Sequence, residues 1–142
     1  MATYFANGSP ETDFSPDDLQ AAIGQTLEQL GDRQRVLALP PDFTRSHSQA
    51  GPITCILHEQ LGERLVDVMP TLGTHEAMSD EELDKMYPTV PRDLIRVHRW
   101  RKDIVTLGEV PSQFVSEQTQ GAWTQAWPAE TNRLVAEGGH DL

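Results

Sequence analysis

The sequence predicts a three-layer α/β domain built around a mostly parallel sheet. The main observation is an order that repeats along the chain: a short apolar run, a polar loop, then a segment with helical periodicity. Runs that are apolar throughout are typical of strands buried on both faces, as in parallel sheets. The length of 142 residues and the hydrophobic fraction of 37% suit one ordinary domain.

The N-terminal part of the chain combines an irregular segment with the clearest helix signal. Residues 1–14 mix aromatic residues with Asn, Gly, Ser and Pro without a period, and TYFA is a candidate for a short edge strand. A helix is expected next, with Ser15 as its N-cap, Pro16 in its first turn and Gly31 as its stop signal. We therefore expect an irregular segment followed by one domain over residues 15–142.

Two units of strand, loop and helix follow this helix. VLALP at residues 36–40 and LVDVM at residues 65–69 are the predicted buried strands. GPITCILHEQLGERL has apolar residues at helical spacing. A third helix is expected to begin with Ser79 as its N-cap and Glu82 as the partner in a capping box.

The C-terminal part of the chain gives a weaker pattern. LIRVHRW and DIVTLGEV are expected to form an edge strand or a hairpin, and ETNRLVAEGGHDL to begin a further strand. Trp123 and Trp127 lie four residues apart, a spacing that indicates packing across a helical turn. The basic cluster in RVHRWRK is either a solvated face or a surface for an anion or a partner.

Charge and composition exclude two classes of partner. The formal net charge is −11, whereas general affinity for nucleic acid or an anionic membrane requires a positive field. No apolar run approaches the ~18 residues of a membrane span, and the N-terminus lacks a signal-peptide pattern. The single cysteine, Cys55, fits a core residue in a reducing compartment. We expect a cytoplasmic protein with no nucleic-acid or membrane partner, in which a local basic pocket could still bind a small anion.

Both predicted strands lead into loops rich in reactive side chains. In DFTRSHS, Asp42 offers a hydrogen-bond acceptor and Arg45 a planar fork suited to a carboxylate or phosphate. In TLGTHEAM, His75 can exchange protons near neutral pH. Ligands of doubly wound α/β folds bind beyond the carboxyl ends of the strands, where these loops are expected. The candidate site residues are Asp42, Thr44, Arg45, Gly73, Thr74 and His75.

Each candidate also has a simpler structural interpretation. Asp42 and Arg45 could pair with each other, the hydroxyl groups could cap helices, and His75 could be an ordinary surface histidine. The repetition of polar loops at equivalent places in successive units favours a shared site, because sheet topology can bring such loops together around one crevice.

The two loops together resemble the N-terminal domain of the lactate racemase family, the nickel-pincer enzymes. The resemblance rests on Asp-x-Thr-Arg at Asp42–Arg45, on the turn at Thr71–His75 and on Ser-x-x-Glu-Leu at Ser79–Leu83. It extends from about residue 15 to the end of the chain. It implies a Rossmann-like domain that forms one wall of an interdomain active site.

The resemblance implies a racemase or epimerase of 2-hydroxy acids. In that family the C2 hydrogen of the substrate passes as a hydride to a nickel-pincer nucleotide and returns to either face. His75 is then the catalytic base that removes the hydroxyl proton. Arg45 faces the substrate's carboxylate or phosphate and Asp42 orients it, and Thr44, Gly73 and Thr74 complete the substrate-binding set.

Other parts of the family pattern lie beyond this chain. The second catalytic histidine, the lysine that carries the cofactor and the histidine that completes nickel ligation are downstream, so the resemblance implies a missing C-terminal domain. We expect the 142-residue fragment to hold no metal and no cofactor and to be inactive alone. Ser46 stands where many members have proline, which indicates another substrate, and His140 receives no role. The alternative is a stand-alone module that binds a small carboxylate or phosphate without catalysis.

Overall fold

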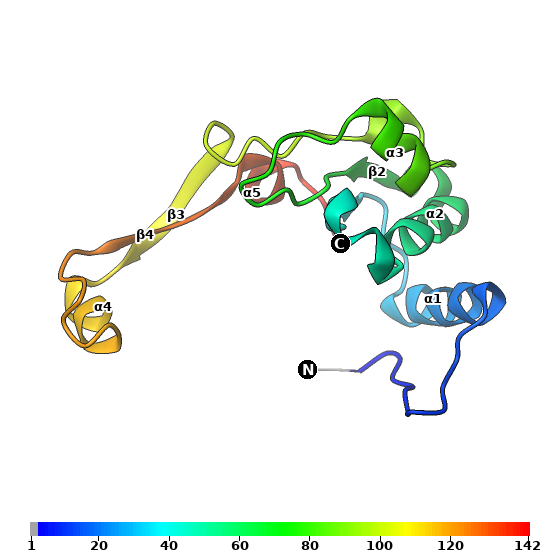
Figure 1. Ribbon diagram of the computed structural model, residues 1–142, viewed down its shortest axis with the longest axis horizontal. Coiled ribbons are helices and arrows are strands. Elements are labelled where there is room, and N and C mark those ends of the chain that lie inside the picture. Colours follow the sequence, from blue (N-terminus) through cyan, green and yellow to red (C-terminus); the bar gives the residue numbers. More distant parts are fainter. Residues whose placement is uncertain (1–2) are drawn as a thin grey trace. The chain divides into compact units, whose positions relative to one another are not determined.

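The computed structural model describes residues 3–142, which divide into two compact units (Figure 1). The first unit contains the chain up to Val97 together with His140–Leu142, and the second contains His98–Gly139. Residues 3–14 contain no helix or strand, so the edge strand considered for TYFA does not form.

A small parallel sheet lies at the centre of the first unit. Strands β1 (Val36–Ala38) and β2 (Leu65–Val68) pair in parallel, as their apolar sequences predict. Backbone contacts extend this pair on both sides. Ile95 forms a parallel bridge to Val68 on β2, and the amide of Leu37 on β1 donates to the carbonyl of Leu142 at 2.9 Å.

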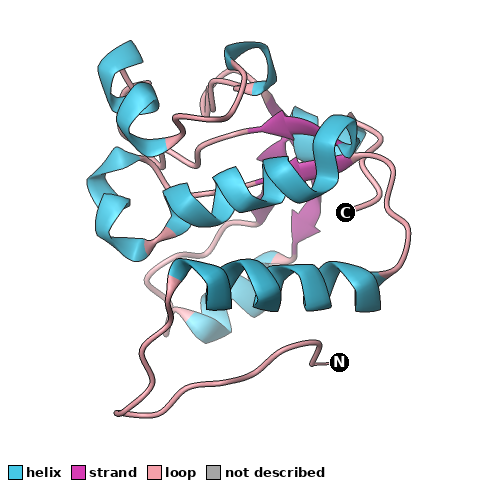
Figure 2. Ribbon diagram, turned by 90° about the vertical axis from the view of Figure 1, so that its right-hand side faces the viewer, coloured by secondary structure: helices cyan, strands magenta, loops and turns pink. Residues whose placement is uncertain are grey.

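Two helices of the first unit lie side by side in Figure 2, α1 (Pro16–Leu30) and α2 (Ala50–Leu61). Ser15 caps α1 as predicted, because its hydroxyl accepts from the Asp18 amide while the Asp18 carboxylate accepts from the Ser15 amide. Gly31 ends the helix at a φ of 76°. Cys55 and Leu61 of α2 are buried in the main core, and Leu27 of α1 packs against that core. Its buried residues are Val36, Cys55, Leu61, Leu65, Val68, Met86, Tyr87 and Val90.

The third helix, α3 (Asp80–Met86), packs its C-terminal end against the start of α2. Ser79 and Glu82 form the predicted capping box. The contact with α2 requires glycine at position 51, since a Cβ atom there would lie 2.5 Å from the carbonyl oxygen of Met86. This close approach holds the residues after α3 near the loop that follows β1.

The second unit is built on an antiparallel pair, β3 (Ile104–Val110) and β4 (Trp127–Asn132), with α4 (Ser112–Gln118) between them in sequence and α5 (Arg133–Glu137) after them. DIVTLGEV therefore forms a strand, as expected, and its antiparallel partner is β4.

Two expectations for the C-terminal part of the chain are corrected by the structure. ETNRLVAEGGHDL continues as a strand only to Asn132, whose side chain accepts from the Leu134 amide at 2.9 Å and starts α5. Trp123 and Trp127 do pack, edge to face with ring centres 5.8 Å apart, but Trp127 lies in β4 rather than in a helix. The spacing of four residues is helical, whereas the contact joins a strand to the loop before it.

The expected fold class is confirmed at the level of a mixed α/β chain with a small parallel sheet. Each sheet among residues 3–142 has two strands. LIRVHRW contributes one bridge, at Ile95, because the following residues enter the second unit. Within the described residues no helix combines the length and apolar character needed to cross a bilayer.

Candidate functional site

The loops that follow β1 and β2 are joined at their base. The amide and the hydroxyl of Thr71 both donate to the carbonyl of Pro40, at 2.8 and 3.1 Å, and Pro41 forms a parallel bridge with Thr71. The first loop continues as the 3-10 helix Phe43–Ser48, and the second turns at Gly73. The polar loops that the sequence places after successive strands are therefore neighbours in space.

Asp42 is the buried centre of this region, with only 2% of its surface exposed. It is the N-cap of the 3-10 helix, and its Oδ1 accepts hydrogen bonds from the amide of Thr44 at 3.1 Å and from the Thr44 hydroxyl. Its Oδ2 lies 2.5 Å from Nδ1 of His75, which comes from the second loop. The carboxylate therefore connects both loops and leaves neither oxygen unpaired.

His75 presents its outer ring atom to solvent. Gly73 turns the loop at a φ of 58°, and the His75 amide closes the turn on the carbonyl of Leu72 at 3.0 Å. The His75 side chain is 49% exposed, although its Nδ1 faces Asp42. Because an ionised carboxylate only accepts hydrogen bonds, Nδ1 carries the proton and the lone pair of the neutral ring lies on Nε2. That atom is the natural site for taking up a proton from a ligand.

Arg45 lies beside the pair, and most of its side chain is exposed to solvent. Its Nη1 is 4.0 Å from Oδ1 of Asp42 and 3.5 Å from the Thr44 hydroxyl, and its side chain is 60% exposed. Asp42 thus contacts Arg45 only loosely and orients His75 instead, which differs from the expected orientation of Arg45 by Asp42. Thr74 lies in the exposed turn between Gly73 and His75.

The balance of effects on Asp42 favours its charged form. Burial raises the pKa of the Asp42 carboxyl, but the hydrogen bonds from Thr44 and His75, together with the charge of His75, outweigh burial and hold the pKa below its ordinary value. The chain therefore carries a buried anion whose two oxygens each have a fixed partner.

Acid should remove the contribution of Asp42 to stability. Since its pKa is lower in the folded than in the unfolded chain, the ionised carboxylate stabilises the fold above about pH 4 and this contribution is lost as the pH falls through the folded-state pKa. Urea unfolding between about pH 2 and pH 6 should show a steeper loss of unfolding free energy for the wild type than for Asp42→Asn. Parallel curves for the two proteins would contradict this role.

A second buried carboxylate lies on β2, and sequence reasoning missed it. Asp67 is 7% exposed and accepts from Nε of Arg96 at 2.6 Å and from Nε2 of His140 at 2.8 Å. Arg96 therefore belongs to a structural ion pair rather than to a free basic surface. His140 holds the end of the chain on the first unit, a contact across 73 positions that no local pattern reveals.

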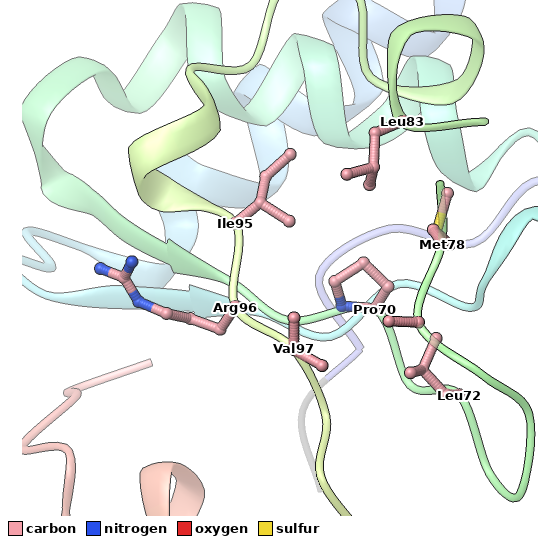
Figure 3. Close-up of a pocket in the computed structure, with 8 residues that line it drawn as sticks. Pro70, Leu72, Met78, Leu83, Ile95, Arg96 and Val97 are labelled. Carbon is pink, nitrogen blue, oxygen red and sulfur yellow. The ribbon is translucent and has the colours of Figure 1, made fainter. Parts of the chain in front are cut away.

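A small cavity adjoins the loop after β2. Pro70, Leu72, Met78, Leu83 and Ile95 line much of it, and Figure 3 shows their side chains around the space while Arg96 extends away from the group. Its volume is about 30 Å³, room for water and too little for a substrate. The cavity is part of the packing beneath the His75 loop.

Metal ligands do not gather in the described part of the chain. Among residues 3–142, no group of three or more His, Cys, Asp or Glu side chains is placed to hold a metal ion. The Asp42 and His75 pair and the Asp67 and His140 pair each provide two such side chains.

The comparisons with known proteins show a fold and no activity. No protein-family model and no curated protein matches the chain. Among solved structures, a Thermotoga maritima protein determined by the Northeast Structural Genomics Consortium is similar to 96% of this chain, with a TM-score of 0.74 and 25% sequence identity. This chain spans 33% of the length of that protein.

Proposed function

We propose that the chain is the N-terminal domain of a 2-hydroxy-acid racemase or epimerase of the nickel-pincer type and is inactive as the isolated 142 residues. The observation that carries the proposal is the 2.5 Å contact between Asp42 Oδ2 and His75 Nδ1, which joins the two loops after β1 and β2. The same loops carry the resemblance to the lactate racemase family. A buried acid that orients a half-exposed histidine is an arrangement suited to proton transfer.

His75 serves as the base in this proposal. Its Nε2 accepts the proton of the substrate's 2-hydroxyl group, and the ring becomes positively charged. Asp42 stabilises that charge through Nδ1 and keeps the ring in one orientation, while Thr44 holds the other carboxylate oxygen. The fixed geometry lowers the cost of aligning the base with the hydroxyl group.

Arg45 supplies the anion contact. In a 2-hydroxy acid the hydroxyl group and the carboxylate are attached to the same carbon. The two neighbouring loops offer a partner for each, His75 as a base for the hydroxyl group and Arg45 as a cation for the carboxylate. Arg45 is close to the pair, 60% exposed and held only by contacts of 3.5 Å or more to Thr44 and Asp42. Its guanidinium can therefore turn toward a bound carboxylate and donate two parallel hydrogen bonds.

The described residues do not fit a resident nickel-pincer nucleotide. In the family that the loops resemble, this group accepts and returns the C2 hydrogen of the substrate when it is bound. No three potential metal ligands cluster among residues 3–142, and Lys85, one of two lysines in the chain, pairs with Glu81 at 2.7 Å. The proposal therefore assigns the cofactor to a C-terminal domain and gives this chain binding and proton transfer.

A three-layer, Rossmann-like sheet belongs to the same proposal. Support comes from the segments at the two edges of the β1 and β2 pair, where Ile95 bridges β2 and the amide of Asp141 donates to the carbonyl of Arg35 at 2.9 Å. Such a sheet would direct both site loops toward a crevice at the carboxyl ends of the strands.

Reconstitution tests the proposed function. The 142-residue chain is combined with the cofactor-bearing C-terminal domain of a nickel-pincer racemase, and the interconversion of enantiomers of short 2-hydroxy acids is followed by chiral chromatography. We expect interconversion by the combination and none by the chain alone. Binding of hydroxy acids without interconversion would leave the non-catalytic binding module as the function of the chain.

Arg45→Lys should weaken substrate capture in the reconstituted enzyme. A point charge replaces a bidentate fork, and the loss of one charge-assisted hydrogen bond raises KM on the order of tenfold. The matched control is Arg64→Lys, since Arg64 pairs with Asp32 at 3.5 Å away from these loops. Equal KM values for the wild type and Arg45→Lys would remove Arg45 from substrate binding.

A further inference from the structure

Tyr87 contacts the loop after β1 from the C-terminal end of α3. It follows α3, is 2% exposed, and donates its hydroxyl hydrogen to the carbonyl of Pro41 at 2.9 Å. The contact spans 46 positions in sequence. The ring is held by the core around Met86, whose carbonyl in turn approaches Gly51 of α2. Tyr87 is therefore a rigid donor aimed at the residue before Asp42.

The chain before Asp42 depends on outside partners for its position. Pro40 and Pro41 have no amide hydrogen, so this turn cannot be fixed by donors of its own. The Pro40 carbonyl accepts two hydrogen bonds from Thr71, and the Pro41 carbonyl accepts one from Tyr87. The hydrogen bond from Tyr87 sets the orientation of the peptide group that joins Pro41 to Asp42.

The hydroxyl of Tyr87 remains a donor over the whole pH range of interest. Burial, together with the negative charge of Asp42, raises the pKa of Tyr87 well above its ordinary value. The phenol is therefore neutral near neutral pH, where Asp42 is ionised, and its hydroxyl hydrogen can be donated to Pro41.

We propose that Tyr87 is a positioning residue for His75: its hydrogen bond to Pro41 places the Asp42 carboxylate where it keeps the His75 proton on Nδ1. Tyr87 acts through the backbone and Asp42, because the chain of contacts runs from its hydroxyl to Pro41 and then from Oδ2 of Asp42 to the imidazole. The importance of this role for catalysis rests on the proposed function, whereas the hydrogen bonds themselves do not depend on it.

The tautomer of His75 tests this role in the 142-residue chain. Nitrogen NMR of histidine-labelled protein distinguishes a ring protonated on Nδ1 from one protonated on Nε2. In the wild type we expect the neutral His75 to be the Nδ1–H form. Tyr87→Phe removes one oxygen and should shift the population toward Nε2–H. Tyr4→Phe is the matched control, because Tyr4 is 39% exposed and lies in the N-terminal segment.

A rescue variant distinguishes a positioning role of the Tyr87 hydroxyl group from a packing role of its ring. Tyr87→p-aminophenylalanine restores a hydrogen-bond donor at the same place and should restore the Nδ1–H form. An unchanged His75 tautomer in folded Tyr87→Phe would overturn the proposal. If Tyr87→Phe does not fold, the wild-type protein is measured instead. Nuclear Overhauser contacts of the Tyr87 hydroxyl hydrogen with Pro41 and Asp42 would support the proposal, and their absence would overturn it.

The NMR experiment and the activity experiment can each reject one hypothesis without the other. A tautomer shift in Tyr87→Phe without any racemisation by the reconstituted protein would keep the positioning role and reject the enzymatic function. Racemisation with no tautomer shift would keep the function and reject the role of Tyr87.

Discussion

His75→Ala is expected to lower the rate of enantiomer interconversion in the reconstituted enzyme by about 10²–10⁴-fold, the usual contribution of a general base. The variant lacks the Nε2 lone pair that accepts the hydroxyl proton in the proposed reaction. The side chain is 49% exposed and lies on a loop, so secondary structure, measured by circular dichroism, should remain as in the wild type. Chiral chromatography of a 2-hydroxy acid after fixed times provides the rates.

His58→Ala is the matched control for this experiment. His58 lies in the last turn of α2, outside the two site loops. The control should turn over at the wild-type rate. Undiminished turnover by His75→Ala would remove His75 from the mechanism.

Leu65→Ala should have the largest effect on stability. Leu65 begins β2 and is 1% exposed within the main core of the first unit. Truncating a buried leucine removes transfer free energy and leaves a cavity, which together lower the free energy of unfolding by about 2–5 kcal/mol. This is a large part of the ~5–15 kcal/mol that stabilises an ordinary domain.

The measurement for Leu65→Ala must report on the first unit. All three tryptophans, at positions 100, 123 and 127, lie in the second unit, so urea unfolding should be followed by helical circular dichroism, to which α1 and α2 contribute most. Leu107→Ala is the control, since Leu107 is 67% exposed and its truncation should change the free energy by less than about 0.5 kcal/mol. Similar losses in the two variants would contradict the assignment of the core.

Local patterns predicted the elements of the first unit well. Ser15 and the pair Ser79 and Glu82 define helix starts because capping satisfies amides within three residues. VLALP and LVDVM form the parallel pair because both are short and mostly apolar, with Asp67 as the exception in the second. In the second unit, pairing of β3 with β4 depends on partners 17 to 28 positions apart, so its form could not be derived from periodicity.

The candidate site was predictable as a set of loops and not as a set of contacts. Two polar loops after successive strands pointed to Asp42 and His75. Their direct contact, across 33 positions, requires the register of β1 against β2 and was not visible in the sequence. Tyr87 gave no signal at all, because a tyrosine after a helix is ordinary and its partner is a backbone carbonyl.

Racemisation in D₂O tests the proposed reaction most directly. One enantiomer of a 2-hydroxy acid with ordinary hydrogen at C2 is incubated with the reconstituted protein, and the opposite enantiomer is analysed for deuterium. We predict interconversion in which the product keeps the hydrogen of the substrate at C2, because only the hydroxyl proton passes to His75 in the proposed reaction. Deuterium at C2 of the product, or binding without any interconversion, would contradict the proposal.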